Sequence, residues 1–166
     1  MDRAELQEIQ GPLKDSYRSD AAAALITLRA DGELDKSQIA CKVDTGRALV
    51  EAGLHPATGG TGALACSGDM LLEALVACAG VTLRSVATSM ELDVSGNVHA
   101  EGDLDFRGTL GVDREAPVGF TDIRLSFDLE SEAEPERLDK LVDVTERYCV
   151  VLQTLRQPPA LTASRT

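Results

Sequence analysis

Four cysteines are the residues of this 166-residue chain whose types could do chemistry, at positions 41, 66, 78 and 149. Cys78 lies in the middle of a strongly apolar segment, and Cys149 lies in a second segment with apolar residues at helical spacing. A thiolate is the nucleophile of cysteine chemistry, and two thiols that meet can cycle through a disulfide. The alternative for each cysteine is a small buried hydrophobic residue of the core.

The spacing of the cysteines and histidines argues against a metal site. No two cysteines form a CxxC pair, and His55 and His99 do not form an HxxxH pair. Structural zinc sites in proteins use such short ligand spacings. The Gly-rich loop His55–Gly62 (HPATGGTG) lacks the glycine spacing of phosphate-binding loops and is interpreted as a turn. We therefore expect neither a metal nor a cofactor.

Two helices are expected to position the cysteines. Gly68–Met90 is apolar on nearly every face, which is typical of a central, buried helix. Ser67 is a plausible N-cap for it, with Asp69 in the first turn. A second helix is predicted to start at the Pro135-Glu136 pair and to run through Cys149 to about Leu155.

Strands are predicted on both sides of the first helix, which makes the fold α+β. A turn at Asp31-Gly32 should join the first two strands, and apolar residues alternate with polar ones between Leu92 and Glu130. The predicted strands outside that alternating region are Ala23–Arg29, Gln38–Val43, Arg47–Ala52 and a last one near Ala160–Ala163. We expect an N-terminal helical arm at 1–19, followed by one domain at 20–166.

Charge and composition exclude several classes of function. The chain has 28 acidic and 16 basic residues, a net charge of −12 and a pI near 4.5, so nucleic acids and anionic membranes would be repelled. The N-terminus MDRAELQEIQ does not resemble a secretory signal. The longest apolar run, Ala74–Leu83, is shorter than the ~20 residues of a membrane span. A cytoplasmic protein is expected, without a nucleic-acid or membrane partner.

The two cysteine-bearing segments together resemble a known family. The run Ser67–Ala87 (SGDMLLEALVACAGVTLRSVA) follows Gly59-Gly60 and precedes Glu146–Leu155 (ERYCVVLQTL). This order is similar to the OsmC/Ohr family, the osmotically inducible protein C and organic hydroperoxide resistance proteins. The resemblance implies antiparallel sheets wrapped around two central helices in an intertwined homodimer. It also implies a role in oxidative stress, as a peroxidase that works without metal or haem.

The same resemblance implies roles for individual residues. Cys78 would be the thiol that attacks the peroxide, and Cys149 the thiol that resolves it, with a dithiol such as a lipoylated protein as reductant. In peroxidases of the family an Arg from the early strands and a Glu before the cysteine helix activate the first thiol. Here Asp69 is the nearby acid, and Arg47 is the best match for the cation, with Arg29 second. Because Asp69 cannot reach Cys78 along one helix, we expect Asp69 of the partner subunit to hold that guanidinium.

Two alternatives remain open at this point. Cys66 is a second candidate for the resolving thiol, whereas Cys41 is expected in the core. The protein could also be a non-enzymatic dimer that binds a small hydrophobic ligand beside an inert thiol. The redox interpretation predicts that the Cα atoms of Cys78 and Cys149 lie within about 7 Å. It also predicts an obligate dimer whose interface exceeds ~2,000 Å².

Overall fold

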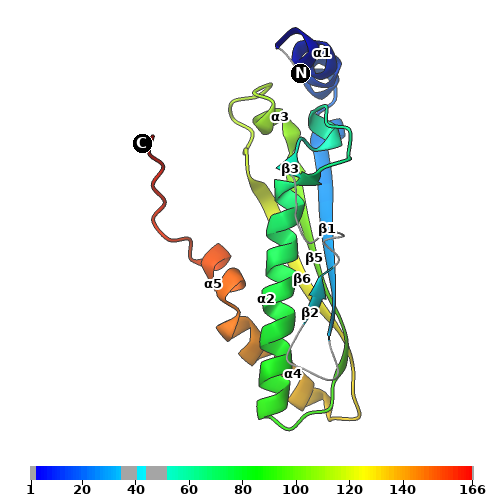
Figure 1. Cartoon of the computed structure of the whole chain (residues 1–166), viewed down its shortest axis with the longest axis vertical. Coiled ribbons are helices and arrows are strands. Elements are labelled where there is room, and N and C mark those ends of the chain that lie inside the picture. The colour runs from blue at the N-terminus through cyan, green and yellow to red at the C-terminus, as the bar shows by residue number, and fades with distance from the viewer. Residues whose placement is uncertain (1–2, 35–40, 44–51, 166) are drawn as a thin grey trace.

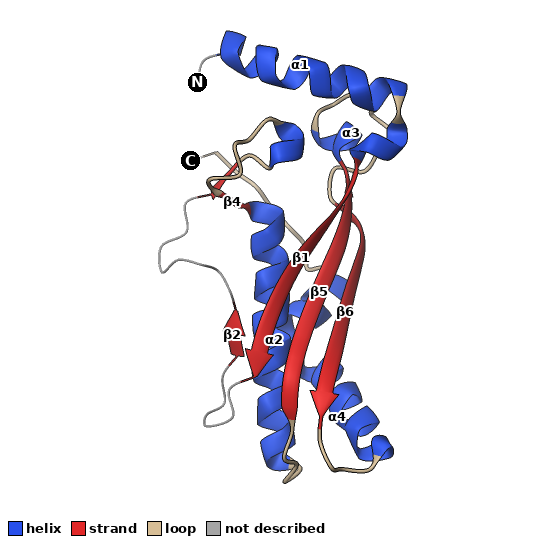
Figure 2. Ribbon diagram, turned by 90° about the vertical axis from the view of Figure 1, so that its right-hand side faces the viewer, coloured by secondary structure: helices blue, strands red, loops and turns tan. Residues whose placement is uncertain are grey.

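The fold is a four-stranded antiparallel sheet with a long helix packed along one face. The computed structural model describes residues 3–34, 41–43 and 52–165. The sheet order is β2-β1-β5-β6, and a two-stranded parallel sheet, β3-β4, lies near the start of the long helix α2 (Figures 1 and 2). The strands are β1 (Leu25–Leu34), β2 (Cys41–Val43), β3 (Ala52–Gly53), β4 (Ala65–Cys66), β5 (Ser95–Asp105) and β6 (Phe120–Glu130). The helices are α1 (Arg3–Ser19), α2 (Ser67–Ser89), α3 (Phe106–Thr109), α4 (Pro135–Tyr148) and α5 (Val150–Arg156), with 3-10 turns η1 (Ala21–Ala24) and η2 (Pro56–Thr58).

The first strand is longer than predicted. The expected turn at Asp31-Gly32 is wrong, because β1 continues through it to Leu34. Asp31 pairs with His99 and Gly32 with Val98 in an unbroken antiparallel ladder with β5. Ladder pairing with a neighbouring strand thus outweighs the local preference of an Asp-Gly pair for a turn. The predicted strand at 47–52 lies outside the described residues except for its last position, which begins β3.

The alternation predicted for the later strands is confirmed. Along β6, Ile123, Leu125, Phe127 and Leu129 are half-buried, and the residues between them are exposed. This period of two places one face of the strand toward the helices and the other toward solvent. The apolar face of β6 therefore forms one side of the layer between the sheet and the helices.

Helix α2 supplies more of the core than any other element in the described residues, but in a single chain several of its large apolar residues stay exposed. Its buried residues pack against β1 and β5: Leu72, Leu75, Val76, Ala79, Gly80, Leu83 and Ala87. Met70, Leu71 and Val81, in contrast, are more than a third exposed. The predicted helix exists, although Ser67 is its first residue and the N-cap is Cys66, without a side-chain capping bond. The expectation of burial on every face is not met by one chain alone.

Helix α2 is also the one helix in the described ranges that is long and apolar enough to cross a membrane. The core helix of a soluble protein can have the same length and apolar composition as a membrane-spanning helix. Here α2 packs along a sheet, with Leu72, Leu75 and Leu83 fully buried. Packing in the core explains the apolar residues on the buried side of α2.

The second predicted helix is interrupted at the cysteine. Helix α4 begins at Pro135 as predicted, but it ends at Tyr148, and α5 begins at Val150. Between them Cys149 has an extended backbone, with φ −70° and ψ 106°. The predicted last strand near 160–163 is absent, because this exposed segment leads away from the sheet and has no strand to pair with (Figure 1).

The N-terminal arm packs across the end of the molecule where α2 begins (Figures 1 and 2). The helix passes through Pro12 without ending there. Tyr17 is buried and donates a hydrogen bond of 2.6 Å to the carbonyl of Ala57. Gly59 has φ +94°, and a Cβ at this position would lie 2.4 Å from Cγ2 of Ile9, so only glycine fits beneath the arm.

Candidate active site

Cys78 and Cys149, the two cysteines singled out in the sequence, meet in the fold. Cys149 is fully buried, and the Cys78 thiol lies close enough to raise the pKa of the Cys149 thiol. Cys78 is half-buried in the middle of α2, on a stripe with Leu71 and Val81 that faces away from β1 and β5. Cys78 and Cys149 are not joined by a disulfide in this structure. The arrangement places one accessible thiol against one inaccessible thiol, which is what a two-thiol redox couple requires.

The bend between α4 and α5 positions the Cys149 thiol. The Cys149 N–H donates to the carbonyl of Thr145 at 2.8 Å, which closes α4, and its carbonyl accepts from the N–H of Gln153 at 2.9 Å, which opens α5. The N–H groups of Val151 and Leu152 interact with the sulfur. In an unbroken helix these N–H groups would be used by carbonyls four residues earlier. The bend thus leaves these N–H groups near the Cys149 sulfur, where they lower the pKa of the thiol.

The electrostatics of the pair separate the roles of the two thiols. Burial raises the pKa of Cys149 to about 11, and the adjacent Cys78 thiol adds to the rise, whereas the N–H groups of Leu152 and Val151 oppose it. At pH 7 a thiol with that pKa is a thiolate in roughly one molecule in ten thousand. Cys149 is therefore poorly suited to attack first, and Cys78, which solvent reaches, is the better initial nucleophile.

The structure describes only some of the residues predicted to activate Cys78. Arg47 lies outside the described residues. Arg29 lies in β1, opposite Glu101 of β5 in the sheet register. Asp69 is in the first turn of α2 as predicted. Burial raises the pKa of Asp69, while the nearby His55 opposes the rise.

The two remaining cysteines lie apart from this pair in different ways. Cys66 is half-buried at the start of α2, twelve residues before Cys78, which is about 18 Å along a helix axis. Cys66 is thus no resolving thiol for Cys78 of its own chain. Cys41 begins β2 and pairs with Leu34 in the register; its expected place in the core stays a prediction.

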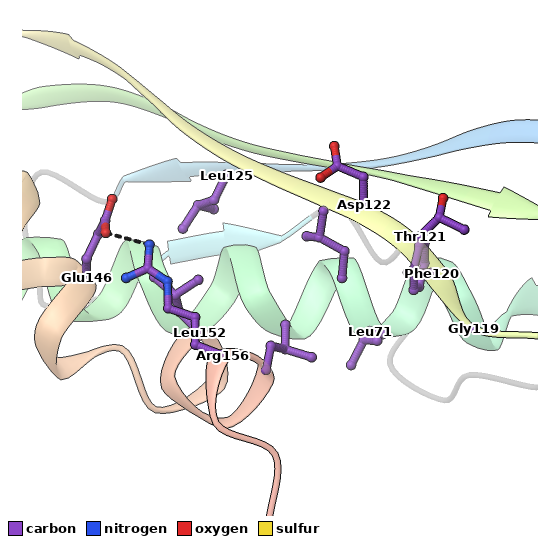
Figure 3. A pocket seen from close by; sticks show the side chains of 11 residues that line it. Leu71, Gly119, Phe120, Thr121, Asp122, Leu125, Glu146, Leu152 and Arg156 are labelled. Carbon is purple, nitrogen blue, oxygen red and sulfur yellow. Dashed lines mark hydrogen bonds and ion pairs between the residues drawn. The ribbon is translucent and has the colours of Figure 1, made fainter. Parts of the chain in front are cut away.

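A cavity that the sequence did not predict lies on the same side of α2, although neither thiol lines it. It has a volume of about 620 Å³ and lies between α2, β6 and α5 (Figure 3). Its apolar wall consists of Leu71, Phe120, Ile123, Leu125, Leu152 and Leu155. Glu146 and Arg156, which form an ion pair of 2.7 Å, lie at one end of it (Figure 3). The alternation of β6 was the only sequence signal for such a wall, since the opposite walls come from α2 and α5.

This cavity approaches Cys149 through one residue of its wall and also continues in another direction. Leu152 forms part of its wall, and the N–H of the same residue interacts with the Cys149 sulfur. A second cavity, of about 360 Å³, shares Leu71, Gly119 and Phe120 with it and extends to Cys66 and His55. A linear apolar molecule could lie along this face of α2.

The described parts of the chain contain no cluster of three or more His, Cys, Asp or Glu side chains that could hold a metal ion.

Comparison with known proteins gives one family and one fold. The family model for OsmC-like protein matches residues 60–164, which include both Cys78 and Cys149. Among solved structures, the fold is similar to an OsmC-like hydroperoxide resistance protein from Jannaschia sp. CCS1. That similarity has a TM-score of 0.56 at 16% sequence identity, and covers 83% of this chain and 91% of the other. No curated protein sequence matches the chain.

Proposed function

The chain belongs to the OsmC-like protein family, and we propose that it is a cysteine-based peroxidase that reduces organic or hydrogen peroxides. The observation that carries this proposal is the contact between the thiols of Cys78 and Cys149. The name of the similar structure, a hydroperoxide resistance protein, supports the same class of reaction.

The proposed reaction has three steps. The thiolate of Cys78 attacks the terminal peroxide oxygen, the O–O bond breaks, and the leaving alkoxide takes a proton to become an alcohol. Cys78 is now a sulfenic acid. The sulfur of Cys149 attacks the sulfur of Cys78, the S–O bond breaks, and hydroxide leaves as water with the thiol proton. A dithiol reductant, such as a lipoylated protein, then reduces this disulfide by thiol–disulfide exchange, is itself oxidised to a disulfide, and restores both thiols.

The difference in environment between the two thiols supports this order of events. Cys149 is inaccessible to solvent, and its proton is held by burial, so that it stays a thiol until a sulfenic acid forms beside it. Cys78 needs a cation to hold it as a thiolate in apolar surroundings. We assign that role to Arg47, with Asp69 of the partner subunit orienting the guanidinium.

The cavity beside the thiols favours organic peroxides as substrates. Its wall of leucine, isoleucine and phenylalanine side chains stabilises an apolar tail by removing its surface from water. Hydrogen peroxide has no such tail and gains nothing from this wall. An alkyl or aryl hydroperoxide is therefore expected to react at a lower concentration than hydrogen peroxide does.

An obligate homodimer is part of the proposal. Met70, Leu71 and Val81 on α2 and Tyr148 and Val150 at the end of α4 and the start of α5 are large apolar residues that one chain leaves exposed. A second copy of the chain that covers this side of α2 would bury these apolar side chains and would enclose the thiol pair. The interface expected is larger than ~2,000 Å² and mainly apolar. We place the protein in the cytoplasm, where cysteines are kept as thiols.

The cavity also favours a second candidate function. A pocket of this size and lining is what a carrier of a small hydrophobic ligand would have, with Cys78 and Cys149 as inert neighbours. This function makes no use of the contact between two thiols, which is why we rank it second.

A thiol titration decides between the two functions. The reduced protein is mixed with cumene hydroperoxide, and the free thiols of each chain are counted before and after the reaction. Loss of two of the four thiols, with a Cys78–Cys149 disulfide found by peptide mass spectrometry, supports the peroxidase. A count that stays at four, together with cumene hydroperoxide bound unchanged, supports the carrier.

A further inference from the structure

The bend at Cys149 is not explained by its own residues. Cys149-Val150-Val151 contains neither proline nor glycine, and the residues on both sides are helical. Sequence periodicity alone predicts one continuous helix here. Something beyond local conformational preference must hold the chain in its bent form.

Two side-chain contacts join the helices across this bend. The Gln153 amide donates a hydrogen bond of 2.7 Å to the carbonyl of Glu146, and the Arg156 guanidinium binds the carboxylate of the same Glu146 at 2.7 Å. Glu146 lies in the last turn of α4, whose final carbonyls have no partner further along that helix. Gln153 supplies one such partner from α5.

The ion pair belongs to the bent form only. Glu146 and Arg156 are ten residues apart, which would separate them by about 15 Å along the axis of a continuous helix. The observed contact therefore requires that α5 turns back toward α4. Together the two contacts join the helices on both sides of Cys149, one through a backbone carbonyl and one through a charge pair.

We propose that Gln153 and the Glu146–Arg156 pair are positioning residues for the resolving half-reaction, because they hold the bend that keeps the Cys149 thiol against Cys78. This inference rests on the proposed peroxidase function and deepens it. The step concerned forms the S–S bond, breaks the S–O bond of the Cys78 sulfenic acid and releases water. If the bend opens, the Cys149 sulfur moves away from Cys78 and loses the N–H groups of Val151 and Leu152.

The test separates the first half-reaction from the second. In Gln153→Met the side chain keeps its length and loses its donor, and the exposed Gln157, which follows α5, gives the matched control Gln157→Met. Each protein receives one equivalent of hydrogen peroxide, followed after set intervals by dimedone, and mass spectrometry gives the fractions of dimedone adduct and disulfide. We expect Gln153→Met to consume peroxide at the wild-type rate but to form the disulfide about fivefold more slowly, the size that loss of one ordinary hydrogen bond implies. Gln157→Met should match the wild type.

The ion pair is tested by exchange of its charges. Arg156→Glu places two carboxylates together and should slow disulfide formation about two- to fivefold, which is the range for an ion pair that is roughly half exposed. The double variant Glu146→Arg with Arg156→Glu should recover the wild-type rate to within about twofold. This pair of variants also decides the matter if Gln153→Met does not fold.

A second oxidant separates this inference from the peroxidase function. Diamide joins two thiols without a peroxide, as it takes up two electrons and two protons and becomes a hydrazine. If the wild type consumes no peroxide but Gln153→Met slows diamide-driven disulfide formation, the positioning role is supported and the peroxidase is refuted. Wild-type rates of disulfide formation in Gln153→Met and Arg156→Glu with both oxidants would overturn the positioning role, as would equal slowing in Gln157→Met.

Discussion

The buried thiol of Cys149 should make the protein less stable in alkali, and the size of the effect follows from its pKa. The change to make is Cys149→Ser, which removes the titrating group. In the native protein, burial and the neighbouring Cys78 thiol raise the pKa of Cys149 from its ordinary 9.0 to about 11. Above pH 9 the unfolded chain gives up this proton while the native chain keeps it. The free energy of unfolding therefore falls as the pH rises from 9 to 11, and is constant with respect to this group below 9 and above 11.

The magnitude is measurable in a chain of this size. Since one pKa unit corresponds to about 1.36 kcal/mol, and the ends of both titrations fall outside this interval, the wild type should lose roughly 2 kcal/mol between pH 9 and pH 11 through Cys149. Urea denaturation at pH 8, 9, 10 and 11, under reducing conditions, gives the free energy of unfolding for wild type and Cys149→Ser. Lysines and tyrosines titrate in both proteins, so the quantity of interest is the difference between the two curves. The buried hydroxyl lowers the stability of the serine variant at every pH and does not change that difference with pH.

One result would refute this reasoning. If the two curves run parallel from pH 8 to pH 11, the proton of Cys149 is not held by burial in the native state. The separation of roles in which Cys78 attacks and Cys149 waits would then lose its physical basis. A difference that grows by about 2 to 3 kcal/mol across this range supports it.

The remaining predictions concern the reaction and the assembly. Cys78→Ser should abolish peroxide consumption, and circular dichroism should show that the fold is retained. Cys149→Ser should consume one equivalent of peroxide and then stop with Cys78 as a sulfenic or sulfinic acid, which intact-mass spectrometry detects. Full turnover by Cys78→Ser would mean that another thiol reacts with the peroxide. Arg47→Ala should raise the pKa of Cys78 and shift its iodoacetamide labelling to higher pH, while Arg29→Ala should not; identical curves for Arg47→Ala and wild type would remove the assigned cation. Light scattering at micromolar concentration should give a dimer for the wild type. Val81→Asp should raise the dissociation constant of the dimer more than tenfold, because it buries a charge in an apolar interface. A monomeric wild type would contradict the proposed dimer.

The site could be predicted from the sequence only in its residue types. Cys78 and Cys149 are recognisable because each lies in an apolar segment of helical period, and the family resemblance depends on the same two segments. Which of them would attack could not be read from composition, since it depends on the burial of Cys149 and on N–H groups from α5. The cavity was missed because its walls come from three elements far apart in the chain.

Local patterns determined the elements, and tertiary contacts determined their limits. The apolar stretch of α2, the start of α4 at Pro135 and the alternation of β6 follow from side-chain periodicity and capping preferences, which act within a few residues. The passage of β1 through Asp31-Gly32 and the break of the helix at Cys149 do not follow from them. The first depends on the pairing of β1 with β5. The second depends on the contacts of Gln153 and Arg156 with Glu146, which lies seven and ten residues before them. Pairing and charge contacts over such separations can outweigh local preferences of about 1 kcal/mol or less per residue, so only the folded chain decides where the two thiols meet.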